Sequence, residues 1–175
     1  MSGMELTIRR ETEADITAIR ALITRAFADD YHSWHNEQEL VEELRDADRL
    51  TLSLVAIAET DIVGFLGATR VRLGDTTGWC VLGPLAVEPP ARRRGVGTGL
   101  VTRAVEELRD AGISGVAALG NPEFYRRFGF RPAPGIRLDI ERGTSPEVEV
   151  LALPLRGDRV PGGVIPPLAR RGDGA

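Results

Sequence analysis

The sequence contains no lysine, one cysteine and two histidines, and aromatic residues make up only 5% of its 175 residues. Because Cys80 is the only thiol, a disulfide framework and a thiolate metal cluster are both excluded. No apolar run is long enough to span a membrane, and the N-terminus lacks the charged and then apolar pattern of a signal peptide. We therefore expect a cytoplasmic protein with no bound metal and no membrane partner.

The charge balance argues against a general nucleic-acid binder, and we expect no nucleic-acid partner. The 22 basic residues are outnumbered by 26 acidic ones, so the formal net charge is -4 at pH 7. The length and the hydrophobic content of 42% suit one core. We expect a single domain over residues 1–175, with its core at about 4–155 and a tail rich in glycine, proline and arginine at 156–175. Monomer and homodimer both stay open.

One stretch, from Val81 to Leu100, carries most of the information. Its pattern predicts an apolar strand ending at Val87, a loop of arginine and glycine, and the start of a helix. Helix N-termini favour anions, and arginine adds charge-assisted bonds to phosphate. We expect Gly95 and Gly97 to adopt backbone angles closed to other residues and to let a ligand approach the main chain. The candidate phosphate-binding residues are Arg92, Arg93, Arg94, Gly95, Val96, Gly97 and Thr98.

Single positions exclude two commoner phosphate loops. A dinucleotide fingerprint needs a third glycine where this chain has Leu100, and a P-loop needs a lysine, which the chain lacks. The loop instead matches the R/Q-x-x-G-x-G/A signature of the Gcn5-related N-acetyltransferases, with Arg92 in the first place. Residues 118–130 resemble the Y-x-x-x-G-F segment of the same family, and especially of its YhbS-like branch, with Tyr125 as the tyrosine. Without this second motif, an ordinary strand-to-helix turn would explain the loop equally well.

The resemblance implies an α+β acetyltransferase fold, in which helices flank both faces of a mixed and strongly bent sheet. It places acetyl-CoA, the co-substrate, in the cleft between the splayed fourth and fifth strands. Gly83-Pro84 independently predicts a bulge in the fourth strand, because proline removes a ladder donor and glycine weakens pairing. In the family, N–H groups freed at this bulge hold the thioester arm, at positions that match Leu85, Ala86 and Val87.

The mechanism implied by the resemblance is direct attack of an amine on the thioester carbonyl. Strand N–H groups would stabilise the oxyanion and Tyr125 would protonate the departing thiolate, so no covalent enzyme intermediate is needed. From the residues alone, Tyr125 would rather be a core tyrosine. Asn121 is a further candidate for binding the cofactor, although helix capping accounts for an asparagine before a proline. Cys80 lacks an identifiable activating partner and is not expected to be a nucleophile.

The general base and the acceptor amine stay open. Histone-modifying relatives carry a carboxylate inside the fourth strand, but Trp79 to Leu82 offers none. By resemblance the segment from Ala28 to His35 borders the acceptor pocket, and an exposed loop is the alternative. A sensor that binds acetyl-CoA without turnover and an interaction domain are two other classes of function. The candidate bases are His32, His35, Glu37 and Asp75.

Periodicity and turn residues predict the remaining elements. The expected helices open at Thr12, at Asn36 with Glu39 as a capping box, and after the glycine loop, the last of these ending near Gly112. A turn is expected from Gly74 to Gly78. The expected strands are Met4 to Arg9, Leu52 to Ala58, Ile62 to Leu73, Trp79 to Val87, Ile113 to Leu119 and Glu147 to Leu155.

Overall fold

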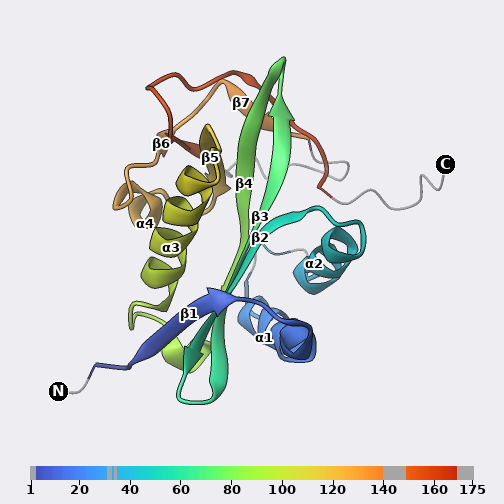
Figure 1. Cartoon of the computed structure of the whole chain (residues 1–175), viewed down its shortest axis with the longest axis vertical. Helices are drawn as coiled ribbons and strands as arrows, with labels where there is room; N and C mark the ends of the chain where they lie inside the picture. The colour runs from blue at the N-terminus through green and yellow to red at the C-terminus, as the bar shows by residue number, and fades with distance from the viewer. Residues whose placement is uncertain (1–2, 31–32, 34, 140–148, 169–175) are drawn as a thin grey trace.

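The structure is a computed structural model that describes residues 3–30, 33, 35–139 and 149–168. Within these residues seven strands form one sheet in the order β1-β2-β3-β4-β5-β8-β6, and β4 and β5 are its one parallel pair (Figure 1). A separate parallel pair joins β7 (Ile136–Leu138) to β9 (Gly163–Ile165). The strands of the main sheet are β1 (Leu6–Arg10), β2 (Leu50–Ala58), β3 (Asp61–Leu73), β4 (Thr76–Val87), β5 (Gly115–Leu119), β6 (Arg131–Pro132) and β8 (Val150–Pro154).

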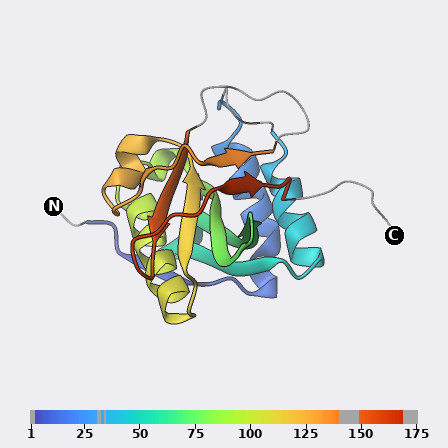
Figure 2. The same ribbon diagram turned by 90° about the horizontal axis from the view of Figure 1, so that it is seen from above.

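Helices cover both faces of the sheet, as the resemblance implied. Seen from above, the helices α1 (Ile16–Ala26) and α2 (Glu37–Asp46) lie on one side, and α3 (Val96–Asp110) and α4 (Pro122–Arg126) lie on the other (Figure 2). Two short 3₁₀ turns, η1 (Glu13–Asp15) and η2 (Pro89–Ala91), precede α1 and follow β4. None of the helices in the described residues is long and apolar enough to cross a membrane.

Each helical layer buries one apolar stripe against the sheet. In α3 the residues Leu100, Ala104 and Leu108 face the core and are at most 2% exposed, at the spacing of one helix face. In α1 the stripe contains Leu22 and Ile23, which pack in a second cluster with side chains of α2 and β3. A third cluster surrounds the buried Trp79 under the β7–β9 pair. These contacts hold β4 at the centre of the sheet, with both of its faces covered.

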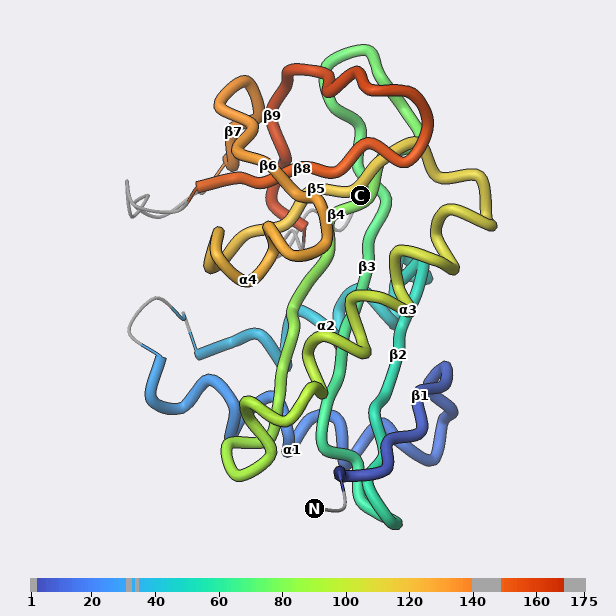
Figure 3. The backbone as a smooth tube through the Cα atoms, turned by 90° about the vertical axis from the view of Figure 1, so that its left-hand side faces the viewer, coloured from blue at the N-terminus to red at the C-terminus, as the bar shows by residue number. Residues whose placement is uncertain are grey.

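The bulge predicted in β4 is present. Leu82 pairs with Ala68 and Leu85 pairs with Leu66, so Gly83 and Pro84 together lie opposite a single residue of β3. The Gly83-Pro84 peptide bond is cis. Pairing between β4 and β5 extends only to Leu82, and the two strands then diverge (Figure 3). After the divergence the chain leads from β4 into the glycine loop and from β5 into α4, so both motifs flank the same gap.

Several local expectations were wrong. Asn36 precedes α2, but it makes no capping bond with its side chain, because its φ of -131° and ψ of 16° lie outside the extended region that a capping residue adopts. The second turn is shorter than the predicted Gly74 to Gly78, since β4 already begins at Thr76 and pairs there with Leu73. By contrast, α3 ends as predicted, with Gly112 in the left-handed region at φ 83°.

The C-terminal third departs most from the prediction. The strand expected at Glu147 to Leu155 is the shorter β8, and residues 147 and 148 lie outside the described part of the chain. The supposed tail contains β9, which pairs with β7. Neither strand was predicted, because each has only three residues, too few for a periodic pattern to be recognised.

Candidate functional site

The loop before α3 has the geometry of an anion site. Gly95 has a φ of 87°, and a Cβ there would meet nothing within 4 Å. Glycine is therefore favoured at this position by the left-handed backbone conformation and not by a lack of space. The first intrahelical bond runs from the N–H of Gly99 to Gly95, which leaves the earlier N–H groups of α3 without helical acceptors. No acidic residue lies in this first turn, and Arg93 and Arg94 beside it are exposed. Gly95, Val96, Gly97 and Thr98 thus form an open helix N-terminus with Arg93 and Arg94 beside it, an arrangement that suits an anion.

Gly97 corrects one expectation. It lies inside α3 with ordinary helical backbone angles, so the special conformation predicted for it is wrong. A Cβ at this position would instead lie 3.4 Å from Cζ of Phe124 and 3.8 Å from Cδ2 of Leu85. The three residues come from α3, α4 and β4, so Gly97 marks the place where these elements meet. Any larger side chain there would enter the space between Phe124 and Leu85.

The splayed half of β4 presents backbone donors to the gap. Within the described chain, β4 has no strand partner on its β5 side beyond Leu82. The N–H of Glu88 donates to a carbonyl oxygen of β3 at 2.8 Å. Because successive N–H groups of a strand point to opposite edges, that of Ala86 also faces β3, and those of Leu85 and Val87 face the gap. Two of the three predicted thioester-binding positions thus have free donors, while Ala86 adds a buried side chain to the core.

Tyr125 lies in α4 and is 5% exposed. Its ring packs against Phe124 and Phe130, with centroid distances of 5.0 Å and 5.3 Å. Its hydroxyl has no hydrogen-bond partner within the described part of the chain. Burial raises the pKa of Tyr125 to about 12, so the phenol keeps its proton at neutral pH and can donate it. Phe124, which the Tyr125 ring contacts, also lies beside Gly97 of α3.

Two other predicted cofactor residues have partners within the protein. Nη2 of Arg92 donates to the carbonyl oxygen of Ala26, at the end of α1, at 2.7 Å. Oδ1 of Asn121 accepts the N–H of Glu123 at 3.0 Å, so the capping interpretation of this asparagine is confirmed. Asn121 is exposed, and the capping bond leaves its amide nitrogen free to donate.

The candidate bases differ in their surroundings. Asp75 is fully exposed in the β3–β4 turn and pairs with a neighbouring arginine, His35 is exposed, and His32 lies outside the described residues. Glu37 is half-buried at the start of α2, where its Oε1 accepts a hydrogen bond from Ser33. Its Oε2 is buried and has no partner among the described residues. A buried carboxylate oxygen without a partner is unfavourable, so Glu37 is the candidate best suited to receive a cationic group.

The remaining candidate groups are structural. Cys80 is fully buried, and burial raises the pKa of its thiol to about 11, so it does not provide a thiolate nucleophile at neutral pH. No group of three histidine, cysteine or acidic side chains in the described ranges could hold a metal ion.

Sequence reasoning missed Phe124, although it precedes the motif tyrosine. It also missed Glu88, whose partner Arg25 is 63 positions away and leaves no local signal.

Comparison with known proteins identifies the family. The sequence profile of the acetyltransferase (GNAT) family matches residues 16–130, well over half of the chain. The uncharacterized N-acetyltransferase YhbS of Escherichia coli K12 is 35% identical over 130 residues, which cover 73% of this chain and 75% of that protein. The chain therefore belongs to the acetyltransferase (GNAT) family, and it is an acyltransferase.

Solved structures agree with this assignment. The crystal structure of YhbS from Escherichia coli in complex with CoA has a TM-score of 0.81 and 28% identity, and covers 95% of this chain and 91% of that one. A GNAT family acetyltransferase from Brucella melitensis, in complex with acetyl-CoA, has a TM-score of 0.78 and 32% identity over 91% and 94% of the two chains. The fold predicted from the two motifs is thus confirmed.

Proposed function

We propose that this protein transfers the acetyl group of acetyl-CoA to a primary amine of a small molecule or peptide. The observation that carries the proposal is the junction of two donor sets: the free N–H groups of the splayed half of β4 and those of the open N-terminus of α3. A third element, α4, closes the junction through Phe124. The CoA and acetyl-CoA complexes of the two structural neighbours support this choice of donor.

The two donor sets suit different parts of acetyl-CoA. The N-terminus of α3 suits the pyrophosphate, because its dipole and unpaired N–H groups favour an anion and Arg93 and Arg94 add positive charge. The edge of β4 suits the amide-rich arm and the thioester. N–H groups of Leu85 and Val87 that point into the gap would stabilise the oxyanion as it develops, without having to reorganise.

In the proposed reaction a neutral amine attacks the thioester carbonyl, and no covalent enzyme intermediate forms. A new C–N bond replaces the C–S bond, the nitrogen loses one proton and the sulfur gains one. Tyr125 donates to the departing thiolate, since its phenol is protonated at neutral pH. Its pKa of about 12 is above that of an ordinary thiol, near 8.5, but the thiolate leaves in the same desolvated gap, where its own basicity is also raised.

We assign the proton acceptor of the amine to Glu37. An alkyl amine is mostly protonated at neutral pH, so a carboxylate that binds the ammonium and then takes its proton serves both steps. Oε2 of Glu37 has no partner among the described residues, which makes it available for this contact. Asp75, an exposed carboxylate in the β3–β4 turn, offers a matched control.

The test is a panel of small amines, amino acids, antibiotics and peptides, with release of the CoA thiol measured beside direct binding of acetyl-CoA. We expect micromolar binding and thiol release with some acceptors. With such an acceptor, Glu37→Gln should lower turnover at pH 7 at least tenfold, and Asp75→Asn should leave it unchanged. Binding without thiol release across the panel would instead identify a sensor of acetyl-CoA.

A further inference from the structure

Three side chains join the end of α1 to the chain that leads out of β4. Arg25 of α1 donates from Nε and Nη2 to the two carboxylate oxygens of Glu88, at 2.9 Å and 2.8 Å. In the other direction, Nη2 of Arg92 donates to the carbonyl oxygen of Ala26, at 2.7 Å. Figure 3 shows α1 beside the end of β4 and the following loop. We call Arg25, Glu88 and Arg92 the clasp.

Each contact of the clasp suits its chemistry. The arginine–carboxylate pair is bidentate, the stronger geometry for such a pair, and the Glu88 side chain is only 22% exposed. Ala26 is the last residue of α1, where carbonyl groups lack helical partners and the helix dipole favours a cation. The guanidinium of Arg92 therefore stabilises the end of α1.

The clasp lies directly before the anion site. Glu88 follows the last residue of β4 and is also held by the bond from its N–H to β3. Pro89 and Pro90 come next, and their fixed φ angles transmit the position of Glu88 to the loop. Arg92 is then three residues before Gly95, the capping residue that precedes α3. Moving either end of this segment would move the N–H groups at the start of α3.

The charges of the clasp are coupled. Hydrogen bonding with Arg25 lowers the pKa of Glu88, and the positive charges of Arg25 and Arg92 lower it further. The Glu88 carboxylate thus interacts with both arginines, and removing it would leave two cations close together without a counter-charge.

We propose that Arg25, Glu88 and Arg92 are positioning residues that hold the glycine loop against α1 in the conformation that binds acetyl-CoA. The inference depends on the proposed binding of acetyl-CoA at this loop. It gives the motif arginine a new role, because its side chain supports the loop from behind instead of contacting phosphate. It also predicts that Arg25, which belongs to neither family motif, controls affinity for the cofactor.

The test compares acetyl-CoA binding by calorimetry in the full chain and in its variants. We expect Arg25→Gln and Glu88→Gln each to weaken binding about five- to twentyfold, and the double variant to be no weaker than Glu88→Gln, because that change already removes the Arg25–Glu88 pair. The exchanged pair Arg25→Glu/Glu88→Arg should recover only part of the affinity, because it restores an ion pair with α1 but places a second cation near Arg92. Arg92→Gln should behave like Arg25→Gln.

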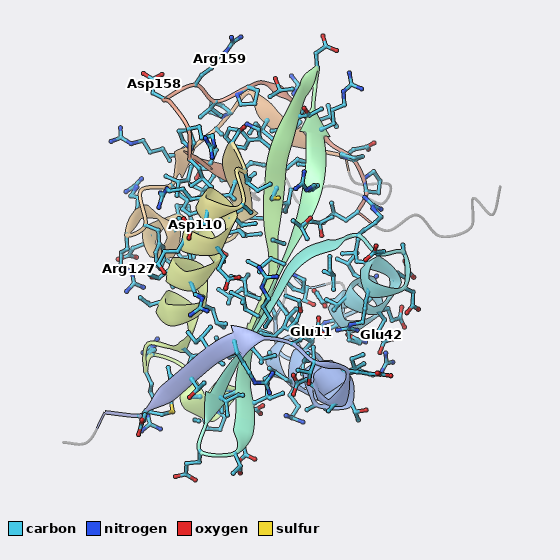
Figure 4. All side chains as sticks on the ribbon, in the orientation of Figure 1. Glu11, Glu42, Asp110, Arg127, Asp158 and Arg159 are labelled. Carbon is cyan, nitrogen blue, oxygen red and sulfur yellow. The ribbon has the colours of Figure 1, made fainter. Side chains whose placement is uncertain are left out.

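Arg20→Gln is the matched control. Arg20 lies on the same helix and forms an ion pair with Glu42 of α2. Figure 4 shows Glu42 on the opposite side of the molecule from Arg127, which lies beside α4. Its loss should change acetyl-CoA affinity less than twofold. Hydrogen exchange gives a second readout: acetyl-CoA should slow exchange at the end of α1 in the wild type and in Arg20→Gln, but not in Arg25→Gln.

Two results would overturn the inference, and they are distinguishable. Folded Arg25→Gln and Glu88→Gln variants that bind like the wild type, beside a weakened Arg92→Gln, would show that Arg92 binds the cofactor directly. A folded wild type without affinity for acetyl-CoA would overturn the proposed function itself, and the clasp as a determinant of affinity with it.

Discussion

Both halves of β4 pair with β3 along one edge, but only the first half pairs with β5 along the other edge. From Trp79 to Leu82 the strand is paired with β3 and with β5, and its side chains are buried. From Gly83 to Val87 it keeps its pairing with β3 but loses β5, and Ala86 alone of its residues is fully buried. In the first half, backbone hydrogen bonds join β4 to both neighbouring strands. In the second half, the N–H groups on the β5 side have no strand partner among the described residues and can bind a ligand.

The contrast shows how one strand can serve both stability and chemistry. The paired half is anchored by Trp79, which packs so closely on Gly115 of β5 that a Cβ there would lie 2.4 Å from the indole ring. The splayed half is held by residues outside the sheet. Arg25 of α1 forms an ion pair with Glu88, and Phe124 of α4 lies with Leu85 beside Gly97. A substitution in the first half should therefore act on folding, and one around the second half on binding or turnover.

Tyr125→Phe should give the strongest separation of turnover from folding. The change removes one oxygen that has no partner among the described residues and leaves the ring packed against Phe124 and Phe130. Stability and acetyl-CoA affinity should barely change, while turnover should fall roughly ten- to a thousandfold, the scale of a lost general acid. Single-turnover rates, a binding titration and thermal melts on the same variant measure the three quantities.

The pKa of Tyr125 sharpens this test. Because burial raises the pKa of Tyr125 to about 12, the wild-type rate should show no loss from Tyr125 ionisation up to about pH 10. Normal single-turnover rates in a folded Tyr125→Phe variant would leave Tyr125 as a core residue and make solvent the acid.

Two glycines allow a direct comparison of the halves. Gly97→Val places side-chain atoms between Phe124 and Leu85, beside the N–H groups of α3, and should weaken acetyl-CoA binding roughly a hundredfold by blocking one or two charge-assisted bonds. Gly115→Ala forces a methyl group onto Trp79 and should cost about 1–3 kcal/mol of stability through overpacking. Denaturation and titration of both variants measure the two effects. If Gly97→Val lost stability but kept its affinity, the anion site would not lie at the N-terminus of α3.

The sequence predictions were accurate where a residue determines its own backbone conformation, and less accurate where a role depends on a distant contact. The loop, the bulge and the end of α3 were predictable because glycine and proline act on their own backbone, as at Gly95, Gly83-Pro84 and Gly112. The role of Gly97 was mistaken, because its motif position does not reveal that it contacts Phe124 from another helix.

Contacts between distant segments left no signal in the sequence. The side chain of Arg92 points to α1, and the partner of Arg25 is Glu88, far along the chain. Glu37 could be listed among four candidate bases, but the burial of its Oε2 depends on how α2 packs. Tyr125 was found only through the family motif, since a buried aromatic ring in α4 has the pattern of any core tyrosine.

The smallest effect is expected at an ion pair that joins β1 to the 3₁₀ turn before α1. The Asp15 carboxylate accepts hydrogen bonds from Nη1 and Nη2 of Arg9, at 2.7 Å and 3.1 Å, and from the N–H of Thr12 at 2.7 Å. The Arg9 bonds contribute most to lowering the pKa of Asp15 to about 2, and the bond from Thr12 adds to the effect. Within the described part of the chain, none of these hydrogen bonds joins the three residues to the glycine loop.

A carboxylate whose pKa is lower in the folded state stabilises the fold above its unfolded pKa, near 4, and this contribution is lost as the pH falls toward 2. Asp15→Asn should therefore lower the unfolding free energy by roughly 1–2 kcal/mol at pH 7 and by much less at pH 2.5, because the wild type has by then lost most of the same contribution. Urea denaturation at the two pH values measures this, and acetyl-CoA affinity at pH 7 should stay within twofold of the wild type. A pH-independent loss of stability would mean that Asp15 acts through packing, and a loss of affinity would show that the N-terminal half of α1 also supports the loop.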